Sequence, residues 1–238
     1  MLFYYIRHGD PIYIPDSLTE LGHKQAKALA NRLSLHGIDK IFSSNSVRAM
    51  QTAKPTCDLL GKQPTICEWA NESYAWNSFT ITNENNQTAW CFQDSTIYQL
   101  FHMPEVRALG MNWYKHSAFS KYNFEKGMKH ADHSVDQFFL KLGYKHDRTN
   151  ARYEIITPND ERVALFAHQG FGLCFLSSLL DVPYPSFSTH FDFGHSSMTV
   201  INFEQHGNFA YPKILQLSND SHLYRENILT GYQNKIEF

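Results

Sequence analysis

Two short apolar segments of this chain each end at a histidine, and this feature constrains the fold more than any other. Residues 2–6 are followed by Arg7 and His8, and residues 163–167 are followed by His168. Each segment is rich in aromatic or aliphatic side chains and has a glycine close behind its histidine, which is typical of a buried strand that ends at a loop. Because parallel strands deliver their carboxyl ends to one edge of a sheet, residues far apart in the sequence can meet there.

The first part of the chain alternates between extended and helical patterns. Residues 16–37 carry apolar side chains at helical spacing and end at a glycine, and residues 46–61 show a second such stretch. Short apolar segments at 38–44 and 65–67 read as strands between and after them. This β-α-β-α-β order favours a parallel sheet. We expect an α/β fold of three layers, with a mostly parallel central sheet and helices on both faces.

The middle of the chain is less regular. From about 74 to 161, aromatic residues are scattered through polar stretches, with a helical pattern near the end. A helix at 171–181, a strand at 197–204 and a further strand at 213–218 follow the second histidine segment. We therefore expect one domain over 1–238, with a cap-like insertion at about 74–161 that lies over the sheet edge.

Composition excludes several classes of protein. A formal charge of −2 gives no general attraction for nucleic acid or acidic lipid. The four cysteines are widely spaced without a CxxC pair, so neither a disulfide framework nor a zinc knuckle is expected. The sequence opens with no signal-peptide pattern, and no apolar run approaches the ~20 residues that cross a bilayer. We expect a cytoplasmic protein that binds neither nucleic acid nor a membrane.

The predicted sheet edge collects imidazole and guanidinium groups. Arg7 lies beside His8, and Arg48 opens the helix after the second strand. One histidine alone is most often a hydrogen-bonding loop residue, but the combination points to an anion site, because guanidinium groups bind phosphate with two hydrogen bonds. A neutral imidazole can attack phosphorus while a second helps to hold the oxygens. Such a pocket can perform phosphoryl transfer without a metal.

Four stretches of the sequence, in order, resemble the motifs of the histidine phosphatase superfamily, which is also called phosphoglycerate mutase-like. They are IRHGD, SLTELGHKQA, SSNSVRAMQTA and FAHQG. The resemblance spans nearly the whole chain apart from the insertion. It implies that His8 is a nucleophile that forms a phosphohistidine, and that Arg7, Arg48 and His168 hold the phosphoryl group. It further implies a small phosphorylated substrate, inorganic phosphate as product, and no cofactor or metal.

The leaving group needs a proton donor, which in this family is usually a carboxylic acid with a raised pKa. Two glutamates compete for this role. Continuing the family's pattern from Arg48 without gaps leads to Glu72, which is the leading candidate, and Glu68 is the alternative. The weaker candidates are Asp10, Asp16 and Glu161.

The sequence departs from the family in several places. Gln169 stands between His168 and Gly170, where glycine usually follows directly, so Gln169 either contributes to the phosphate site or is a spacer. The first motif is followed by Asp10 and Tyr13 without the asparagine of many relatives, which leaves a fifth phosphate ligand in doubt. The mutase signature after the catalytic glutamate is not reproduced by NESYAW. A phosphatase is therefore favoured over a mutase.

Two features of the insertion have alternative explanations. His130 and His133 have the spacing of metal ligands on a helix, but without a third ligand a solvated face is favoured. Several aromatic residues could stack on a ring-bearing leaving group, although packing within the insertion is favoured. They are Trp76, Phe79, Trp90, Phe92, Tyr98, Phe101, Trp113 and Tyr114.

The sequence thus predicts a metal-independent phosphatase that hydrolyses a small phosphate monoester through a phosphohistidine on His8. Two alternatives remain open. One is a cofactor-dependent transfer of the phosphoglycerate mutase type, which uses the same intermediate. The other is a protein that binds a phosphorylated ligand without catalysis.

Overall fold

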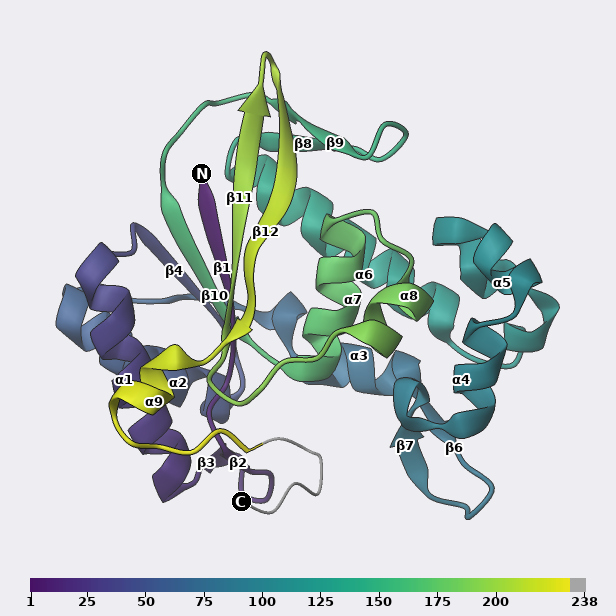
Figure 1. Ribbon diagram of the computed structural model, residues 1–238, viewed down its shortest axis with the longest axis horizontal. Coiled ribbons are helices and arrows are strands. Elements are labelled where there is room, and N and C mark those ends of the chain that lie inside the picture. Colours follow the sequence, from purple (N-terminus) through teal and green to yellow (C-terminus); the bar gives the residue numbers. More distant parts are fainter. Residues whose placement is uncertain (232–238) are drawn as a thin grey trace.

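A mixed eight-stranded sheet forms the centre of the protein (Figure 1), for which a computed structural model describes residues 1–231. Its strands are β1 (Leu2–Arg7), β4 (Lys40–Ser44), β5 (Thr65–Cys67), β8 (Tyr144–Asp147), β9 (Arg152–Ile155), β10 (Arg162–Ala167), β11 (Met198–His206) and β12 (Phe209–Asn219). They are ordered β5-β4-β10-β1-β11-β12-β9-β8. The first four in this order are parallel and the others pair antiparallel, so the parallel half carries both histidine strands.

Helices cover both faces of this sheet, which confirms the predicted three-layer α/β fold (Figure 1). One side carries α1 (Glu20–His36), α2 (Val47–Leu60) and the short α9 (Ser221–Arg225). The other side carries α3 (Glu72–Phe79), α6 (Phe124–Lys141), α7 (Gln169–Leu179) and α8 (Tyr184–His190).

The side chains of β1 show why two helical layers form. Phe3 and Tyr5 point into a cluster with residues of α6 and α7, whereas Tyr4 and Ile6 point into a second cluster with residues of α1 and α2. Successive side chains of a strand face opposite sides of the sheet, so a strand that is apolar at every position must be covered on both. A continuous apolar strand therefore places its carboxyl end between two layers of helices.

The helix predicted at 46–61 agrees closely with α2, whereas the stretch predicted at 16–37 becomes helical only from Glu20, because Ser17–Leu18 form a short strand. Helix α1 begins after Thr19, whose Oγ1 accepts a hydrogen bond from the Gly22 N–H (3.0 Å), and ends before Gly37. Helix α2 begins after Ser46, whose hydroxyl caps the Ala49 N–H (3.3 Å). The cap residues and the terminal glycines are visible in the sequence, so the ends of these two helices can be predicted from it.

The segment from 74 to 161, predicted as an insertion, divides into two parts in the structure. Helix α6 packs against the sheet, and β8 and β9 extend it at the end away from β5. The remaining elements lie beside the sheet (Figure 1). They are β6 (Thr80–Thr82), β7 (Thr88–Trp90), α4 (Ser95–Phe101), α5 (Pro104–Ala108) and the 3₁₀ helices Cys91–Gln93, Gly110–Lys115 and Ser117–Phe119.

The aromatic residues of this segment have two different environments. Phe79, Phe101 and Trp113 are at most 1% exposed and pack on one another and on Tyr184 of α8. They belong to the same hydrophobic cluster as Phe3 and Tyr5 of β1, so this part of the segment shares its core with the sheet. Trp76, by contrast, is 40% exposed.

Two smaller elements complete the fold. A hairpin of β2 (Pro11–Ile12) and β3 (Ser17–Leu18) follows β1, and a 3₁₀ helix, Glu68–Ala70, follows β5. All four cysteines are buried thiols. Among residues 1–231, no helix combines the length and apolarity needed to span a bilayer.

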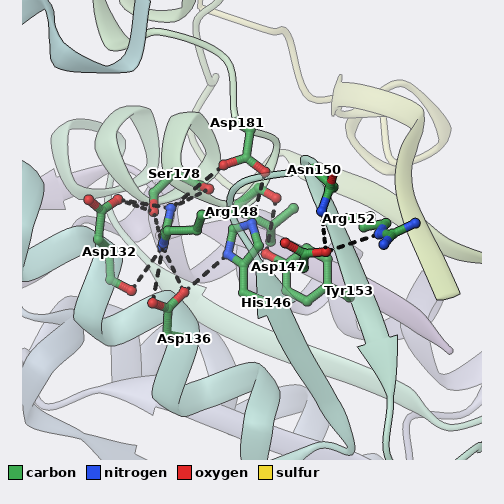
Figure 2. Close-up of polar contacts among 11 residues, drawn as sticks. Asp132, Asp136, His146, Asp147, Arg148, Asn150, Arg152, Tyr153, Ser178 and Asp181 are labelled. Carbon is green, nitrogen blue, oxygen red and sulfur yellow. Dashed lines mark hydrogen bonds and ion pairs between the residues drawn. The ribbon is translucent and has the colours of Figure 1, made fainter.

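A partly buried polar network ties the far end of α7 to α6 and β8 (Figure 2). Arg148 donates to both carboxylate oxygens of Asp136, at 2.8 and 3.2 Å, and to the Ser178 hydroxyl at 3.0 Å. Ser178 in turn donates to Asp132 (2.6 Å). Since α7 begins directly after His168, this network fixes the position of the helix whose first turn borders that histidine.

His146 is the charged centre of this network. Its two ring nitrogens lie 3.1 Å from Asp136 Oδ1 and 2.8 Å from Asp181 Oδ2, and its side chain is 0% exposed. Both carboxylates accept hydrogen bonds, so both nitrogens must carry protons. Burial alone would lower the pKa of His146, but the hydrogen bonds to the two aspartates outweigh it and raise the pKa above its usual value of 6.5.

The stability of the protein is therefore expected to depend on pH through His146. Because its pKa is raised by folding, its contribution is fully present below about pH 6.5 and is lost as the pH rises through the raised value. We expect the difference in unfolding free energy between the natural chain and His146→Gln to be largest near about pH 6 and to shrink toward about pH 9. Urea denaturation across this range measures it.

The control is His133→Gln, which changes an exposed histidine on α6. This variant should differ from the natural chain by the same small amount at every pH. A constant difference for His146→Gln as well would contradict the protonated state assigned to the network.

Candidate active site

The carboxyl ends of β1 and β10 bring the two predicted histidines together. The strands pair in parallel with Arg7 opposite Ala167, so His8 and His168 leave the sheet side by side. Their ring centroids are 5.3 Å apart with an edge-to-face arrangement. Both side chains are almost fully buried. Two residues separated by 160 positions thus share one site.

The His8 ring is held with one nitrogen free. Its Nδ1 lies 2.7 Å from the carbonyl oxygen of Gly9. A carbonyl can only accept, so Nδ1 carries the proton and Nε2 keeps its lone pair. Burial, followed by the charge of Arg7, lowers the pKa of His8 well below its usual value. His8 is therefore a neutral imidazole with Nε2 available as a nucleophile.

Residues of the second and third motifs hold the loop after β1. The Gly9 N–H donates to Thr52 Oγ1 (3.0 Å), and the Asp10 N–H donates to Gln25 Oε1 (2.7 Å). Gly9 also lies against Gly22, where a Cβ on Gly9 would meet the Gly22 oxygen at 2.7 Å. These contacts explain why the motifs combine glycines with small or amide side chains at these positions.

Arg48 is fixed at the beginning of α2 by Asp16. One carboxylate oxygen of Asp16 accepts from Arg48 Nη1 (2.8 Å) and the other accepts from the Val47 N–H (2.7 Å). The second terminal nitrogen of Arg48, Nη2, lies 3.8 Å from Glu72 Oε2. Asp16, a weaker proton-donor candidate in the sequence, thus acts as a support for the guanidinium group.

Arg7 is held on the opposite side by a loop that the sequence analysis did not include in the site. Its Nη1 donates to the carbonyl of Phe193, and its Nη2 lies 2.8 Å from His195 Nε2. Since Arg7 can only donate, His195 Nε2 must accept and the ring proton must lie on Nδ1, 3.3 Å from Asp10 Oδ1. Burial and the Arg7 charge lower the pKa of His195 to about 4, so this ring is neutral.

His195 also stacks on the His8 ring. The centroids of His195 and His8 are 5.8 Å apart, and the Ser196 N–H donates to the His8 carbonyl (2.9 Å). The sequence analysis missed this residue because it did not predict that β11 pairs antiparallel with β1. An antiparallel neighbour brings the residues before its own start to the carboxyl end of β1. That pairing is the signal that would have identified His195.

The structure places the two candidate proton donors, Glu72 and Glu68, in different environments. Glu72 lies at the first turn of α3, where Oε1 accepts from the Phe171 N–H (3.1 Å) and the side chain is 17% exposed. Burial raises the pKa of Glu72, and that backbone hydrogen bond and Arg48 only partly oppose it. Glu68 is exposed and does not line the pocket described below. Glu72 is therefore the carboxyl group that the fold brings to the histidines.

His168 lies behind His8 and Glu72. Its Nε2 is 2.9 Å from the hydroxyl of Ser44 and 3.3 Å from that of Ser46. Its Nδ1 is 3.3 Å from Glu72 Oε2, although the angle does not make a hydrogen bond. Burial and the neighbouring His8 lower the pKa of His168, so it is neutral in the unliganded protein.

Gln169 is the first residue of α7 and lines the same pocket. Its side-chain amide donates to the carboxylate of Asp192. This contact occupies one amide proton of the residue that the sequence analysis proposed as a phosphate ligand. The remaining polar groups of Gln169 stay open to such a role.

A pocket of about 550 Å³ opens in front of His8. Three aromatic side chains form part of its wall, together with both arginines and Glu72. The lining residues are Arg7, His8, Tyr13, Arg48, Asn71, Glu72, Ser73, Trp76, Trp90, Gln169 and Gly170. A groove of similar volume between α1 and α9 is lined by none of these residues.

Three residues of the pocket region have the spacing of metal ligands, but the charge around them does not suit a cation. Ligand atoms of His8, Glu72 and His168 lie within 4.8 Å of one another. The guanidinium groups of Arg7 and Arg48 line the same pocket, however, and would repel a cation. This electrostatic environment favours an anion.

The remaining candidates of the sequence analysis lie outside this pocket. His130 Nε2 hydrogen-bonds to the Trp69 carbonyl oxygen (3.1 Å), and His133 is exposed on α6. Glu161 forms an ion pair with Lys40 (2.7 Å). None of the three lines the pocket with His8.

The motifs and the fold define the class of protein. Residues 4–95 match the model of the histidine phosphatase superfamily, branch 1. This match covers the first three motifs. Residues 4–95 thus carry the sequence signature of the histidine phosphatase superfamily, which confirms the resemblance inferred from the sequence.

Individual relatives are more distant. A PE-PGRS family protein of Mycobacterium tuberculosis, PE_PGRS11, is 37% identical over 82 residues, which cover 30% of this chain. The aligned part spans only 14% of the length of that curated relative.

Among solved structures, the phosphoserine phosphatase of Entamoeba histolytica with 3-phosphoglyceric acid has a TM-score of 0.59 at 16% identity. A mycobacterial glucosyl-3-phosphoglycerate phosphatase with inorganic phosphate has the same TM-score at 19% identity. In both comparisons, 93% of this chain and 98% of the other are covered. At such identities the likeness is one of fold.

His195→Phe is expected to weaken anion binding. The substitution keeps a flat ring beside His8 but removes the acceptor for Arg7 Nη2. A hydrogen bond that involves a charged group is worth about 1.5–3 kcal/mol, so the Kd for inorganic phosphate should rise about tenfold or more. Isothermal titration calorimetry measures this change. His133→Phe is the control, and an unchanged Kd for His195→Phe would show that Arg7 does not need this support.

Proposed function

We propose that this protein is a phosphatase that hydrolyses a small phosphate monoester through a phosphohistidine on His8, without a metal ion. The observation that carries this proposal is the meeting of the His8 and His168 rings, two guanidinium groups and a carboxyl group of raised pKa around one pocket. The buried thiols of the chain also fit the reducing cytoplasm that the sequence predicts.

The first step uses the lone pair of His8 Nε2. This nitrogen attacks the phosphorus, the P–N bond forms, and the ester P–O bond breaks. Glu72 gives its proton to the departing oxygen, which leaves as an alcohol. The raised pKa of Glu72 supports this role, because the carboxyl group must be protonated before the attack.

The second step regenerates the enzyme. The Glu72 carboxylate takes a proton from a water molecule as the water oxygen attacks phosphorus, and the P–N bond breaks. Inorganic phosphate leaves, His8 regains its lone pair, and Glu72 is protonated again. The same residue therefore acts as acid and then as base.

Several buried nitrogens at the site support an anionic substrate. Within the described chain, Arg7 Nε, Arg48 Nε and His168 Nδ1 have no hydrogen-bond partner. An unpaired buried polar group is costly, and the negative charge of a bound phosphate nearby would offset part of this cost. A bound dianion would also favour protonation of His168, because an opposite charge nearby stabilises the imidazolium form.

His8→Ala should abolish hydrolysis of a phosphate ester such as naphthyl phosphate, because the attacking nitrogen is removed. In the natural chain, rapid acid-free quenching during turnover should trap phosphate on His8 Nε2, detected by mass spectrometry. His23→Ala changes an exposed histidine of α1 and should keep full activity. Turnover by His8→Ala would refute the proposed nucleophile, whereas binding of phosphate without turnover by the natural chain would favour the non-catalytic alternative.

Glu72→Gln should slow the hydrolysis of alkyl phosphates, which have poor leaving groups, by at least about 100-fold. Activated aryl phosphates should lose much less activity, because their leaving groups need little protonation. Ratios of kcat/KM for the two kinds of ester measure the difference. Glu68→Gln is the matched control and should leave kcat/KM for both kinds of ester unchanged. An equal loss for both esters in Glu72→Gln would assign the proton transfer to another group.

A further inference from the structure

The wall of the pocket beyond the arginines is aromatic. Trp76 and Trp90 meet edge to face with centroids 5.0 Å apart, and both line the pocket with Tyr13. Trp76 is 40% exposed and Tyr13 is 64% exposed. Trp76 and Tyr13 therefore keep exposed ring surface beside the pocket, whereas Phe79 and Trp113 are buried in the core.

The position of Trp90 is fixed against the helix that follows His168. A Cβ on Gly170 would lie 2.3 Å from Trp90 Cη2, so the indole rests directly on the backbone of the first turn of α7. Trp90 also stacks on Phe92, with the ring centroids 5.5 Å apart. The indole is thus pre-organised, and binding a ring against it costs little conformational entropy.

The proton donor and the aromatic wall lie on one helix. Glu72 and Trp76 are four residues apart on α3, so they share one face of it. The leaving-group oxygen must lie within hydrogen-bond reach of Glu72. The rest of the leaving group then extends along this face toward Trp76.

The charges of the pocket limit what this leaving group can be. Arg7 and Arg48 are the only arginine or lysine residues among the described residues that line it, and both are placed to hold the phosphoryl group. A leaving group with a carboxylate or a second phosphate would find no further cation beside it. Burying such a charge without a partner is costly.

We propose that the preferred substrate is a phosphate monoester whose leaving group is uncharged and carries a flat ring, which binds against Trp76 and Trp90. This inference rests on the proposed phosphatase function and narrows it. It also separates the protein from mutase-type transfer, in which a second phosphate must be held in the pocket.

Three alkyl phosphates test the proposal, because their alkoxide leaving groups are similarly poor: 2-naphthylmethyl phosphate, propyl phosphate and phosphoserine. We expect kcat/KM for the naphthylmethyl ester to exceed kcat/KM for each of the other two esters by about tenfold or more. Stacking of the ring on an aromatic side chain accounts for a preference of this size. Trp76→Ala should lower the ratio of kcat/KM for naphthylmethyl phosphate to kcat/KM for propyl phosphate about tenfold. Tyr224→Ala, which removes an 88% exposed ring on α9, should leave this ratio unchanged.

Binding provides a readout that does not depend on turnover. In His8→Ala, tryptophan fluorescence should show naphthylmethyl phosphate binding about tenfold more tightly than propyl phosphate or phosphoserine. Trp76→Leu, which keeps an apolar side chain at this position, should lose most of this preference when combined with His8→Ala.

The outcomes of these experiments distinguish a failure of the ring-binding site from a failure of the phosphatase function. If no ester is hydrolysed but naphthylmethyl phosphate binds selectively, the ring site stands and the phosphatase function fails. If phosphoserine or propyl phosphate is hydrolysed as fast as the naphthylmethyl ester, or if the Trp76 variants keep the preference, the ring site fails and the phosphatase function stands.

Discussion

The parallel pairing of β1 with β10 is the constraint on which the site depends. It places Arg7 and Ala167 at the same level, so the residues that follow them, His8 and His168, leave the sheet together. Every other part of the site is arranged around this pair. Helices cover the two strands on both faces, so polar groups that follow the strands emerge at the carboxyl edge. The chemistry of the site therefore follows from the way an entirely apolar strand must be buried.

Around this pair, each polar group that lines the pocket is held by a second group. Asp16 holds Arg48, the backbone N–H of Phe171 holds Glu72, and His195 with Asp10 holds Arg7. Such supports fix the side chains in place, which reduces the reorganisation needed when an anion binds. The two arginines are supported differently, Arg48 by a carboxylate and Arg7 by a neutral ring and a carbonyl.

Much of this arrangement could be predicted from the sequence, and the exceptions have a common physical reason. The strands, helix caps and motif residues depend on local patterns, which is why α1, α2 and the neighbourhood of His8 were predictable. His195 was not, because its place depends on which strand lies beside β1, a long-range pairing that local patterns do not determine. For the same reason β8 and β9 were assigned to the insertion, although they extend the central sheet. The choice between Glu72 and Glu68 likewise needed their burial to be known.

The contact between Trp90 and Gly170 has a consequence for how this pocket could change in evolution. The hairpin of β6 and β7 rests on the same backbone turn that borders the pocket. The hairpin could not be exchanged as an independent module, since a larger residue in place of Gly170 would meet the indole. The wall of the pocket and the turn after His168 would have to change together, through paired substitutions across that contact.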